Sequence, residues 1–379
     1  MSYQFEVIRM DLYDVGRSVD LEKAQRLVPA SRGFHVVAGR DTPESIYVPK
    51  PLIVQLDSMI FDQGTTPASA GQSVRSISIQ AKIYEDGVVS MIGRMVVSAE
   101  LTELHTLRSI PLPVERESTT IGELMSTSFK GLLVKISQAI TVEEYSFDSL
   151  ERESYTVYCL TDPVPDPRRF LDDNAHYLTT FLLGERPDFE LHDAQIESTI
   201  RHLFSFRKSD VIVLDLDRCF IIDPARDYED ILLVLELANY QLLELRTLDK
   251  VLDRWLDQAE DDIRAVYMRR SRRMRKLSKK LGGLLPLRLD ALFILENLEN
   301  TSKIIGDYYL GQIYTHLCDL INTKAWELSV HRRLDTLQEI YSMAKIDVNE
   351  RVVLMLEVLV VVFFAAELVA LLLPIFLPK

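Results

Sequence analysis

Histidine and cysteine side chains are the first candidates for chemistry, because both serve as nucleophiles and as metal ligands. No two histidines lie four residues apart, no H-E-x-x-H motif occurs, and the cysteines contain no C-x-x-C pair. We therefore expect no metal site and no catalytic residue among them, and the sparse cysteines favour a reducing compartment. These residues are His35, His105, His176, His192, His202, His316 and His331, with Cys159, Cys219 and Cys318.

An aspartate pair is the second candidate. The apolar run Ile212–Leu214 is followed by Asp215 and Asp217, which superficially resemble the D-x-D nucleophile motif of haloacid-dehalogenase phosphatases. In that family the first aspartate attacks phosphate and the second handles the leaving group. Here Arg218 and Cys219 follow, and then another apolar strand in place of the helix that the motif needs. The segment is therefore predicted to be the polar turn of a β-hairpin.

The strongest charge feature is a basic cluster near the end of a predicted long helix. Positions 264 to 280 hold nine basic residues and no acidic one, and Gly282, Gly283 and Pro286 then end the helix. The cluster is either the solvated tip of a helical hairpin, favourable at a helix C-terminus, or an electrostatic contact for RNA, acidic protein or anionic lipid. It consists of Arg264, Arg269, Arg270, Arg272, Arg273, Arg275, Lys276, Lys279 and Lys280.

The composition limits the function classes. The chain has 379 residues, a formal charge of −14 and 47% hydrophobic residues, with few glycines and prolines. This excludes a disordered or collagen-like protein and argues against a nucleic-acid-binding surface over the whole molecule. No P-loop, G-x-G-x-x-G or G-x-S-x-G motif occurs. We therefore expect no enzyme activity and no cofactor.

The elements that hold these residues begin with an α+β head domain at positions 1–226. Alternating apolar and polar residues predict a strand over Ser76–Tyr84, and Glu85–Gly87 supplies the turn into a hairpin partner, Val88–Ile92. Further strands are predicted at Tyr155–Leu160, Val211–Leu214 and Cys219–Ile222, and helices near Phe129–Ile140, Arg169–Leu183 and Asp193–Phe204. This order is typical of an α/β sandwich.

Helical patterns dominate positions 227–350, which are predicted to form a helical hairpin or coiled-coil stalk. An apolar seam at steps of four and three runs between positions 235 and 256, with Asp249 in one of its slots. A second helix is predicted over Leu287–Ile321, and a third carries a seam between positions 330 and 348. The seams fit packing within one chain or, for the third helix, self-association.

The segment at positions 351–379 is predicted to be one transmembrane helix. Val352–Pro378 is apolar apart from Glu357 and Glu367, and the basic residues before it favour a cytosolic body. The expected protein is tail-anchored and forms a homo-oligomer through stalk and span. Carboxylates inside a span are costly, so both glutamates are expected to face a helix–helix contact or the membrane interface.

The C-terminal half resembles a known family. Ile305–Leu310 and His331–Leu337 stand before a terminal segment that contains Leu356-Glu357, and Glu236–Arg246 lies upstream. This arrangement is similar to the required-for-meiotic-nuclear-division family, also called domain of unknown function 155. The resemblance runs from roughly Asp210 onward and implies an α/β head, a helical hairpin, a membrane anchor and no catalytic residues. Eukaryotic relatives act in mitochondria in support of translation. Without a transit-peptide composition, the expected location here is a bacterial inner membrane.

These features together favour a membrane-anchored oligomeric scaffold or tethering protein whose cytosolic head recruits a partner. The alternative is a divalent cation channel similar to the CorA family, which also places an α/β domain and long helices before its spans. That family carries Gly-Met-Asn after a first span and needs a second span, and neither occurs in this sequence. The sequence therefore favours the scaffold.

Overall fold

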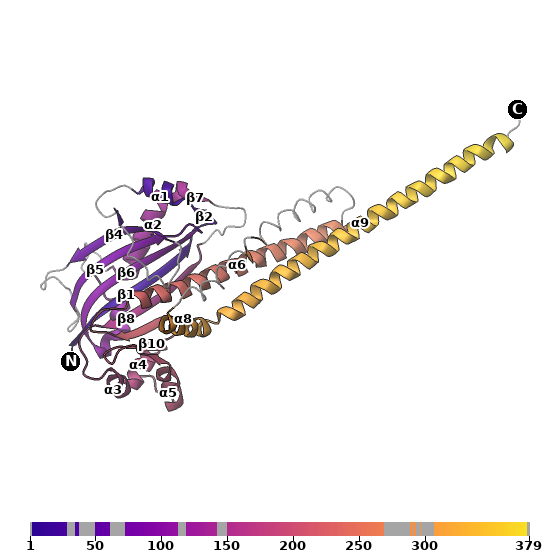
Figure 1. Ribbon diagram of the computed structural model, residues 1–379. Coiled ribbons are helices and arrows are strands. Elements are labelled where there is room, and N and C mark those ends of the chain that lie inside the picture. The colour runs from indigo at the N-terminus through magenta and orange to yellow at the C-terminus, as the bar shows by residue number, and fades with distance from the viewer. Residues whose placement is uncertain are drawn as a thin grey trace. The chain divides into compact units, whose positions relative to one another are not determined.

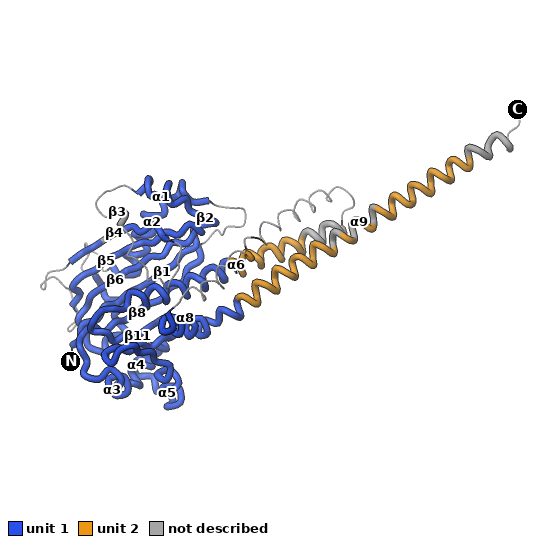
Figure 2. Tube along the Cα trace, in the orientation of Figure 1, with its two compact units in different colours: residues 1–247, 296–326 blue, residues 248–295, 327–379 orange. Residues whose placement is uncertain are grey.

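The computed structural model describes residues 2–28, 35–37, 50–60, 73–112, 119–141, 150–268, 289, 291–292, 296 and 307–376. The chain divides into two compact units (Figure 2). The first, called the head, consists of Met1–Thr247 and Glu296–Trp326. The second, called the helical unit, consists of Leu248–Leu295 and Glu327–Lys379.

A nine-stranded sheet, counted over the described residues, organises the head (Figure 1). Its strand order is β3-β4-β5-β6-β1-β8-β11-β10-β9, and neighbours are antiparallel except for the parallel pair β8 and β11. The strands are β1 (Ser2–Asp14), β3 (His35–Val37), β4 (Leu52–Ile60), β5 (Ser73–Ile83), β6 (Val88–Glu100), β8 (Arg152–Leu160), β9 (Leu203–Phe204), β10 (Val211–Leu214) and β11 (Arg218–Ile222). A separate pair joins β2 (Ser18–Val19) to β7 (Ile140–Thr141). The expected α+β class is confirmed.

Strand β1 is the centre of this sheet and pairs with β6 on one side and β8 on the other. Its side chains alternate between the two faces, as in any strand. Val7 lies in the core on one face, whereas Ile8 and Met10 lie in the core on the other. Because both faces are buried, apolar residues occupy both sets of positions, and the sequence patterns above do not predict this strand.

The hairpins that the sequence predicts are present. β5 and β6 are longer than expected, and Gly87 in the turn between them has φ +94°, a conformation that glycine adopts without strain. The turn that contains Asp215 and Asp217 joins the antiparallel strands β10 and β11. The prediction of a polar hairpin turn there is therefore confirmed.

The helices of the head are shifted from their predicted ranges. The first begins earlier, because Thr120 and Glu123 form a capping box at the start of α2. The second divides at Asn174 into α3 and α4. The short helical elements are α1 (Leu21–Leu27), α2 (Ile121–Ile136), α3 (Pro167–Asp173), α4 (Ala175–Leu182), α5 (Asp193–Arg201), and the 3-10 segments η1 (Leu101–Ser109) and η2 (Ser137–Ala139).

Helices cover both faces of the sheet. On one face, called the α2 face, α2 and α4 bury Met125, Phe129 and Phe181 in the core. On the other, called the α6 face, α6 (Glu229–Met268) and α8 (Tyr308–Leu320) bury Leu235 and Ile313. Because the first half of α6 packs in this core, the head continues past the expected boundary at position 226, as far as Thr247.

The helical unit contains the second half of α6 and most of α9 (Thr323–Phe376). Val330, Leu337 and Tyr341 of the third predicted seam are buried within the single chain, so packing inside the chain accounts for this seam. Asp249, the polar residue of the first seam, is also buried. Its Oδ1 lies 2.9 Å from Arg333 Nε and accepts a 2.9 Å hydrogen bond from Ser329 Oγ, which explains a carboxylate at a seam position.

The predicted transmembrane helix is wrong. Within the described ranges of the chain, no helix is long and apolar enough to cross a membrane. This finding overturns the tail anchor, the inner-membrane location and the homo-oligomeric partnering through a span.

Candidate anion site on the α2 face

A row of polar residues crosses the centre of the α2 face. In the register of the sheet, Arg9 of β1 lies opposite Thr156 of β8, and Thr156 lies opposite Arg218 of β11. Residues paired across neighbouring strands share a face, so Thr156 stands between two arginines. On the far side of Arg9, the paired residue of β6 is Gly93. Polar groups inside an apolar sheet need specific partners, which makes this row a candidate site.

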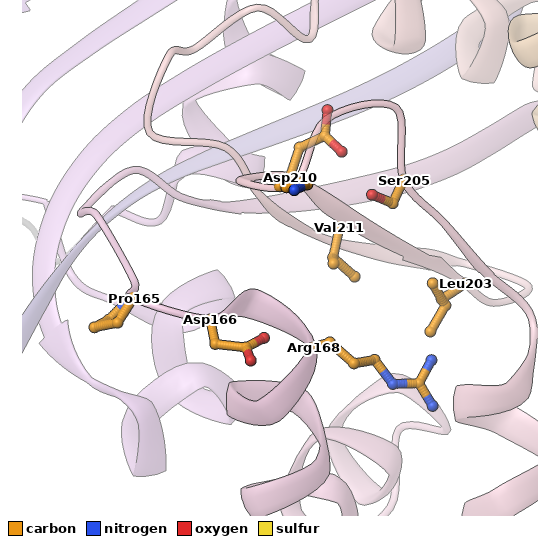
Figure 3. A pocket seen from close by; sticks show the side chains of 8 residues that line it. Pro165, Asp166, Arg168, Leu203, Ser205, Asp210 and Val211 are labelled. Atoms are coloured by element: carbon orange, nitrogen blue, oxygen red, sulfur yellow. The ribbon is translucent and has the colours of Figure 1, made fainter.

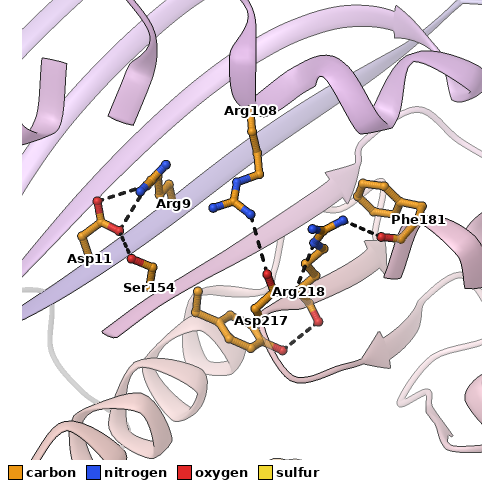
Figure 4. A network of polar contacts seen from close by, with 8 residues as sticks. Arg9, Asp11, Arg108, Ser154, Phe181, Asp217 and Arg218 are labelled. Atoms are coloured by element: carbon orange, nitrogen blue, oxygen red, sulfur yellow. Dashed lines mark hydrogen bonds and ion pairs between the residues drawn. The ribbon is translucent and has the colours of Figure 1, made fainter. Parts of the chain in front are cut away.

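Arg9 is held in place by a buried carboxylate. Its Nε lies 3.1 and 3.0 Å from the two carboxylate oxygens of Asp11, which is 1% exposed and accepts a 2.6 Å hydrogen bond from Ser154 Oγ (Figure 4). The guanidinium lies under the first turn of α2, where a Cβ on Gly122 would lie 2.7 Å from Nη1. No hydrogen bond between described residues engages Arg9 Nη1 or Nη2. Those donors remain for another group.

Two further arginines meet near this row. Arg108 Nη1 of η1 lies 3.7 Å from Asp217 Oδ2, and Arg218 Nε lies 3.2 Å from Asp217 Oδ1 (Figure 4). Arg218 Nη1 also donates a 2.7 Å hydrogen bond to the carbonyl oxygen of Phe181, which fixes its guanidinium. Arg218 is mostly buried, whereas Asp217 is half exposed. An accessible carboxylate therefore bridges Arg108 and Arg218, which together with Arg9 we call the arginine cluster.

The charges of all three arginines affect the pKa of Tyr158. Tyr158 follows Thr156 by two residues on the same face of β8. Burial raises the pKa of its hydroxyl, and the positive charges of Arg108, Arg218 and Arg9 oppose that rise. The negative charge of Asp217 adds to the rise. Asp11 contacts Arg9, and Asp215 lies within the electrostatic reach of Arg218 and Asp217, so three arginines and three aspartates meet at this face.

Several buried polar atoms at the arginines have no hydrogen-bond partner within the described structure. They include Thr156 Oγ1, on a residue that is 1% exposed, His105 Nε2, Asp215 Oδ2 and Arg218 Nε itself. Burial lowers the pKa of His105, and the charge of Arg218 lowers it further, so its imidazole is mainly neutral at pH 7. An unpaired buried polar atom costs about 1–3 kcal/mol. Unengaged arginine donors and a spare hydroxyl are the chemistry of an anion site.

The basic cluster predicted from the sequence stays a prediction. Arg264 lies in α6, but its side chain is not among those that the structure describes. The other members lie outside the described residues: Arg269, Arg270, Arg272, Arg273, Arg275, Lys276, Lys279 and Lys280. Glu357 and Glu367 are exposed on α9, and their expected place inside a membrane span is wrong.

The other sequence candidates have structural explanations. Asp215 accepts a 2.7 Å hydrogen bond from the N–H of Leu216, and burial raises its pKa. Cys159 and Cys219 are fully buried, and burial raises the pKa of both thiols, which disfavours a nucleophilic thiolate. Among the residues with a described placement, no group of three histidine, cysteine, aspartate or glutamate side chains could hold a metal ion.

A cavity of about 540 Å³ lies elsewhere in the head, between the start of α3 and the segment around β9 and β10 (Figure 3). Its charged lining residues are Asp166, Arg168, Lys208 and Asp210. Both aspartates already accept backbone N–H groups of their own helix start or loop. These side chains stabilise local turns, so we take the arginine cluster rather than this cavity as the candidate site.

The sequence patterns above do not select the arginine cluster. Arg218 enters them only as a departure from the D-x-D motif, and Arg9 lies in the strand whose alternation is hidden. One signal is present in the sequence. Arg9 and Asp11 are charged residues two positions apart inside the otherwise apolar stretch Val7–Tyr13. Charged residues in such a strand are rarely buried without a partner.

The fold and this site define a mixed α+β head with a candidate anion site at its central strand, joined to a long helical unit. The chain belongs to the family described as "Uncharacterized protein MJ0711, N-terminal domain", which matches residues 4–229. It is similar to the uncharacterized protein MJ0711 of Methanocaldococcus jannaschii, with 24% identity over 297 residues that cover 78% of this chain and 81% of the relative. No solved structure gives a significant match.

This family overturns the resemblance to the required-for-meiotic-nuclear-division family. The matched region is the head, whereas the resemblance rests on residues from about Asp210 onward. Leu310, Leu334 and Leu337, which belong to the segments that carry it, are buried. Apolar residues at helical spacing are needed by any packed pair of helices, so their order does not distinguish one helical family from another.

Proposed function

We propose that the protein is a non-catalytic scaffold whose head recruits a partner protein by binding an anionic group of that partner at the arginine cluster. One observation carries this proposal. The half-exposed carboxylate of Asp217 bridges Arg108 and Arg218 on the face of the sheet that also carries Arg9, whose terminal nitrogens make no hydrogen bond to a described residue. The protein's own carboxylate thus occupies a place in which a partner's anion fits.

The groups around the cluster support binding over catalysis. Arginine stays charged at physiological pH and serves as a donor, not as a proton shuttle. The Ser154 hydroxyl donates to Asp11, and that carboxylate also accepts both contacts from Arg9. This arrangement positions the arginine and does not form a nucleophile–base pair.

The charge of the chain favours a protein partner over a nucleic acid. A net charge of −14 repels a polyphosphate backbone, whereas one small cluster of arginines fits a single anionic group. No feature of the described residues favours the cation channel.

The test is capture of partners by the tagged full-length chain, by the Arg108→Gln variant and by a matched control, Arg169→Gln. Arg169 is 80% exposed on α3 and, among the described residues, forms an ion pair with Asp173 alone, so its loss leaves the cluster intact. We expect the wild type and the control to capture the same proteins, which Arg108→Gln does not capture and which rising salt releases. Identical capture by all three chains, measured by quantitative mass spectrometry, would contradict the proposal.

A further inference from the structure

We propose that the anionic group recognised by the arginine cluster is a phosphate, and that Asp217 occupies its place until the phosphate displaces it. This inference rests on the proposed function and names the chemistry of its ligand. It also assigns Asp217 the role of an internal competitor, so that removing its charge should strengthen phosphate binding.

The number of donors exceeds what one carboxylate can use. Asp217 contacts one nitrogen of Arg108 at 3.7 Å and one of Arg218 at 3.2 Å. Strong charge-assisted hydrogen bonds between nitrogen and oxygen are shorter, about 2.7–2.9 Å. The contacts of the Asp217 carboxylate are therefore weak. The terminal nitrogens of Arg9 make no hydrogen bond to Asp217 or to another described residue.

A phosphate satisfies this donor set better than a carboxylate does. It presents three strong acceptor oxygens and carries about −1.5 to −2 charges at pH 7. The row across the sheet places the Thr156 hydroxyl, which is buried and has no partner among described residues, between Arg9 and Arg218. A hydroxyl donor flanked by guanidinium groups from β1 and β11, with Arg108 above them from η1, matches an ion with several acceptors.

The place of Asp217 in the fold allows the exchange. It lies in the turn between β10 and β11, half exposed, so its side chain can leave the arginines without breaking a strand. An internal anion that must be displaced weakens the apparent affinity for an external one. Removing that anion therefore strengthens phosphate binding, whereas an ordinary surface ion pair, which contributes little to stability, has no such effect.

The experiment is isothermal titration of the full chain with inorganic phosphate and, separately, with O-phosphoserine, at constant ionic strength. Four proteins are compared: the wild type, Asp217→Asn, Arg108→Gln and the control Arg169→Gln. We expect Asp217→Asn to bind phosphate about tenfold more tightly than the wild type and Arg108→Gln about tenfold more weakly, a difference of one charge-assisted contact. Arg169→Gln should match the wild type.

The two ligands separate the sources of the phosphate. Tighter binding of O-phosphoserine indicates a phosphate carried by a partner, and equal binding indicates free phosphate; both agree with the proposal. Equal phosphate affinity of the wild type, Asp217→Asn and Arg108→Gln would overturn it. If none of the four proteins binds phosphate while partner capture still depends on Arg108, the phosphate is excluded and recruitment through another anion stands. If no protein binds phosphate and partner capture does not depend on Arg108, both proposals are contradicted.

Folding of the variants does not decide the outcome. Arg108 and Asp217 are partly exposed, and circular dichroism of each variant shows whether the head is intact. If Arg108→Gln does not fold, the comparison of Asp217→Asn with the wild type alone decides the proposal, because it predicts a gain of binding that damage to the fold does not produce.

Discussion

On the α6 face of the sheet, cations meet carboxylates at close range. Arg94 Nη1 and Nη2 lie 2.6 and 2.7 Å from the two carboxylate oxygens of Glu229, and Lys82 pairs with the buried Glu236 of α6. On the α2 face, the three members of the arginine cluster share two aspartates and leave donors unengaged. The cations on one face of the sheet are therefore engaged by carboxylates, whereas those on the other face keep donors that are not engaged.

The difference separates folding from recognition. On the α6 face, each of these pairs joins a strand to α6. These cations therefore hold the helix on the sheet and are engaged by carboxylates. On the α2 face, Asp11 already balances Arg9, and the contacts of Asp217 with Arg108 and Arg218 are long. Arg218 also holds α4 through the Phe181 carbonyl, so Arg9 and Arg108 are the cations of this face that remain available to a ligand.

The largest expected effect is on the α6 face. Replacing Arg94 by Gln removes the cation that pairs with Glu229 and Glu6. Because Arg94 and Glu229 are 27% and 37% exposed, the loss should be smaller than for a fully buried pair, about 2–3 kcal/mol of unfolding free energy. Urea titration measures it, with Arg169→Gln as the control. A loss within the error of that control would show that the pairing on this face is not structural.

The next effect is the pH dependence of carboxyls on the α6 face. Burial raises the pKa of Asp14 and of Asp86 to about 6 each, and burial also raises the pKa of Glu244. The fold thus favours their neutral forms. Their contribution to stability is complete below their ordinary pKa near 3.8 and is lost as the pH rises through about 6.

These carboxyls should therefore make the head more stable at pH 5 than at pH 7.5 by about 1–2 kcal/mol. His105 and His316 oppose this effect, because burial lowers the pKa of each imidazole and so favours its neutral form in the fold. The double variant Asp14→Asn with Asp86→Asn should show a smaller difference between the two pH values, because an amide does not titrate. Asp217→Asn, on the other face, serves as the control and should keep the wild-type difference. If the double variant also keeps the full difference, these carboxyls are not its source.

A smaller effect on stability, with a clear effect on binding, is expected at Gly122. A methyl group there would lie 2.7 Å from Arg9 Nη1, and this end of a flexible side chain can move away. Alanine also favours the helix, so the unfolding free energy should change by less than about 1 kcal/mol. Displacement of the guanidinium should weaken phosphate binding severalfold in the titration. Unchanged binding would show that Arg9 does not take part.

The sequence predicts the fold where one face of an element is polar. Strand β5 alternates because one set of its side chains is apolar, and its hairpin with β6 follows from the turn at Gly87. Strand β1 lies at the centre of the sheet and is buried on both faces. Its sequence therefore shows no clear alternation of apolar and polar residues. The seam between positions 330 and 348 predicts a packed helix correctly, but spacing alone does not say whether the partner helix belongs to the same chain.

The candidate site could not be predicted because its members meet only through the sheet. Arg9 comes from the first strand, Arg108 from a 3-10 segment and Arg218 from β11, and more than two hundred positions separate the first from the last. The basic cluster can be recognised from the sequence alone, because its charges lie close together between positions 264 and 280. Composition identifies local charge, whereas strand register creates a site from distant residues.

The most direct test measures two quantities on two variants, Arg94→Gln and Arg108→Gln: the free energy of unfolding in urea and the affinity for inorganic phosphate. If the two faces divide folding and recognition, Arg94→Gln should lose about 2–3 kcal/mol of stability and keep its phosphate affinity. Arg108→Gln should lose less than about 0.5 kcal/mol and bind phosphate about tenfold more weakly. Equal losses of stability in both variants, with phosphate binding unaffected by Arg108→Gln, would contradict the account.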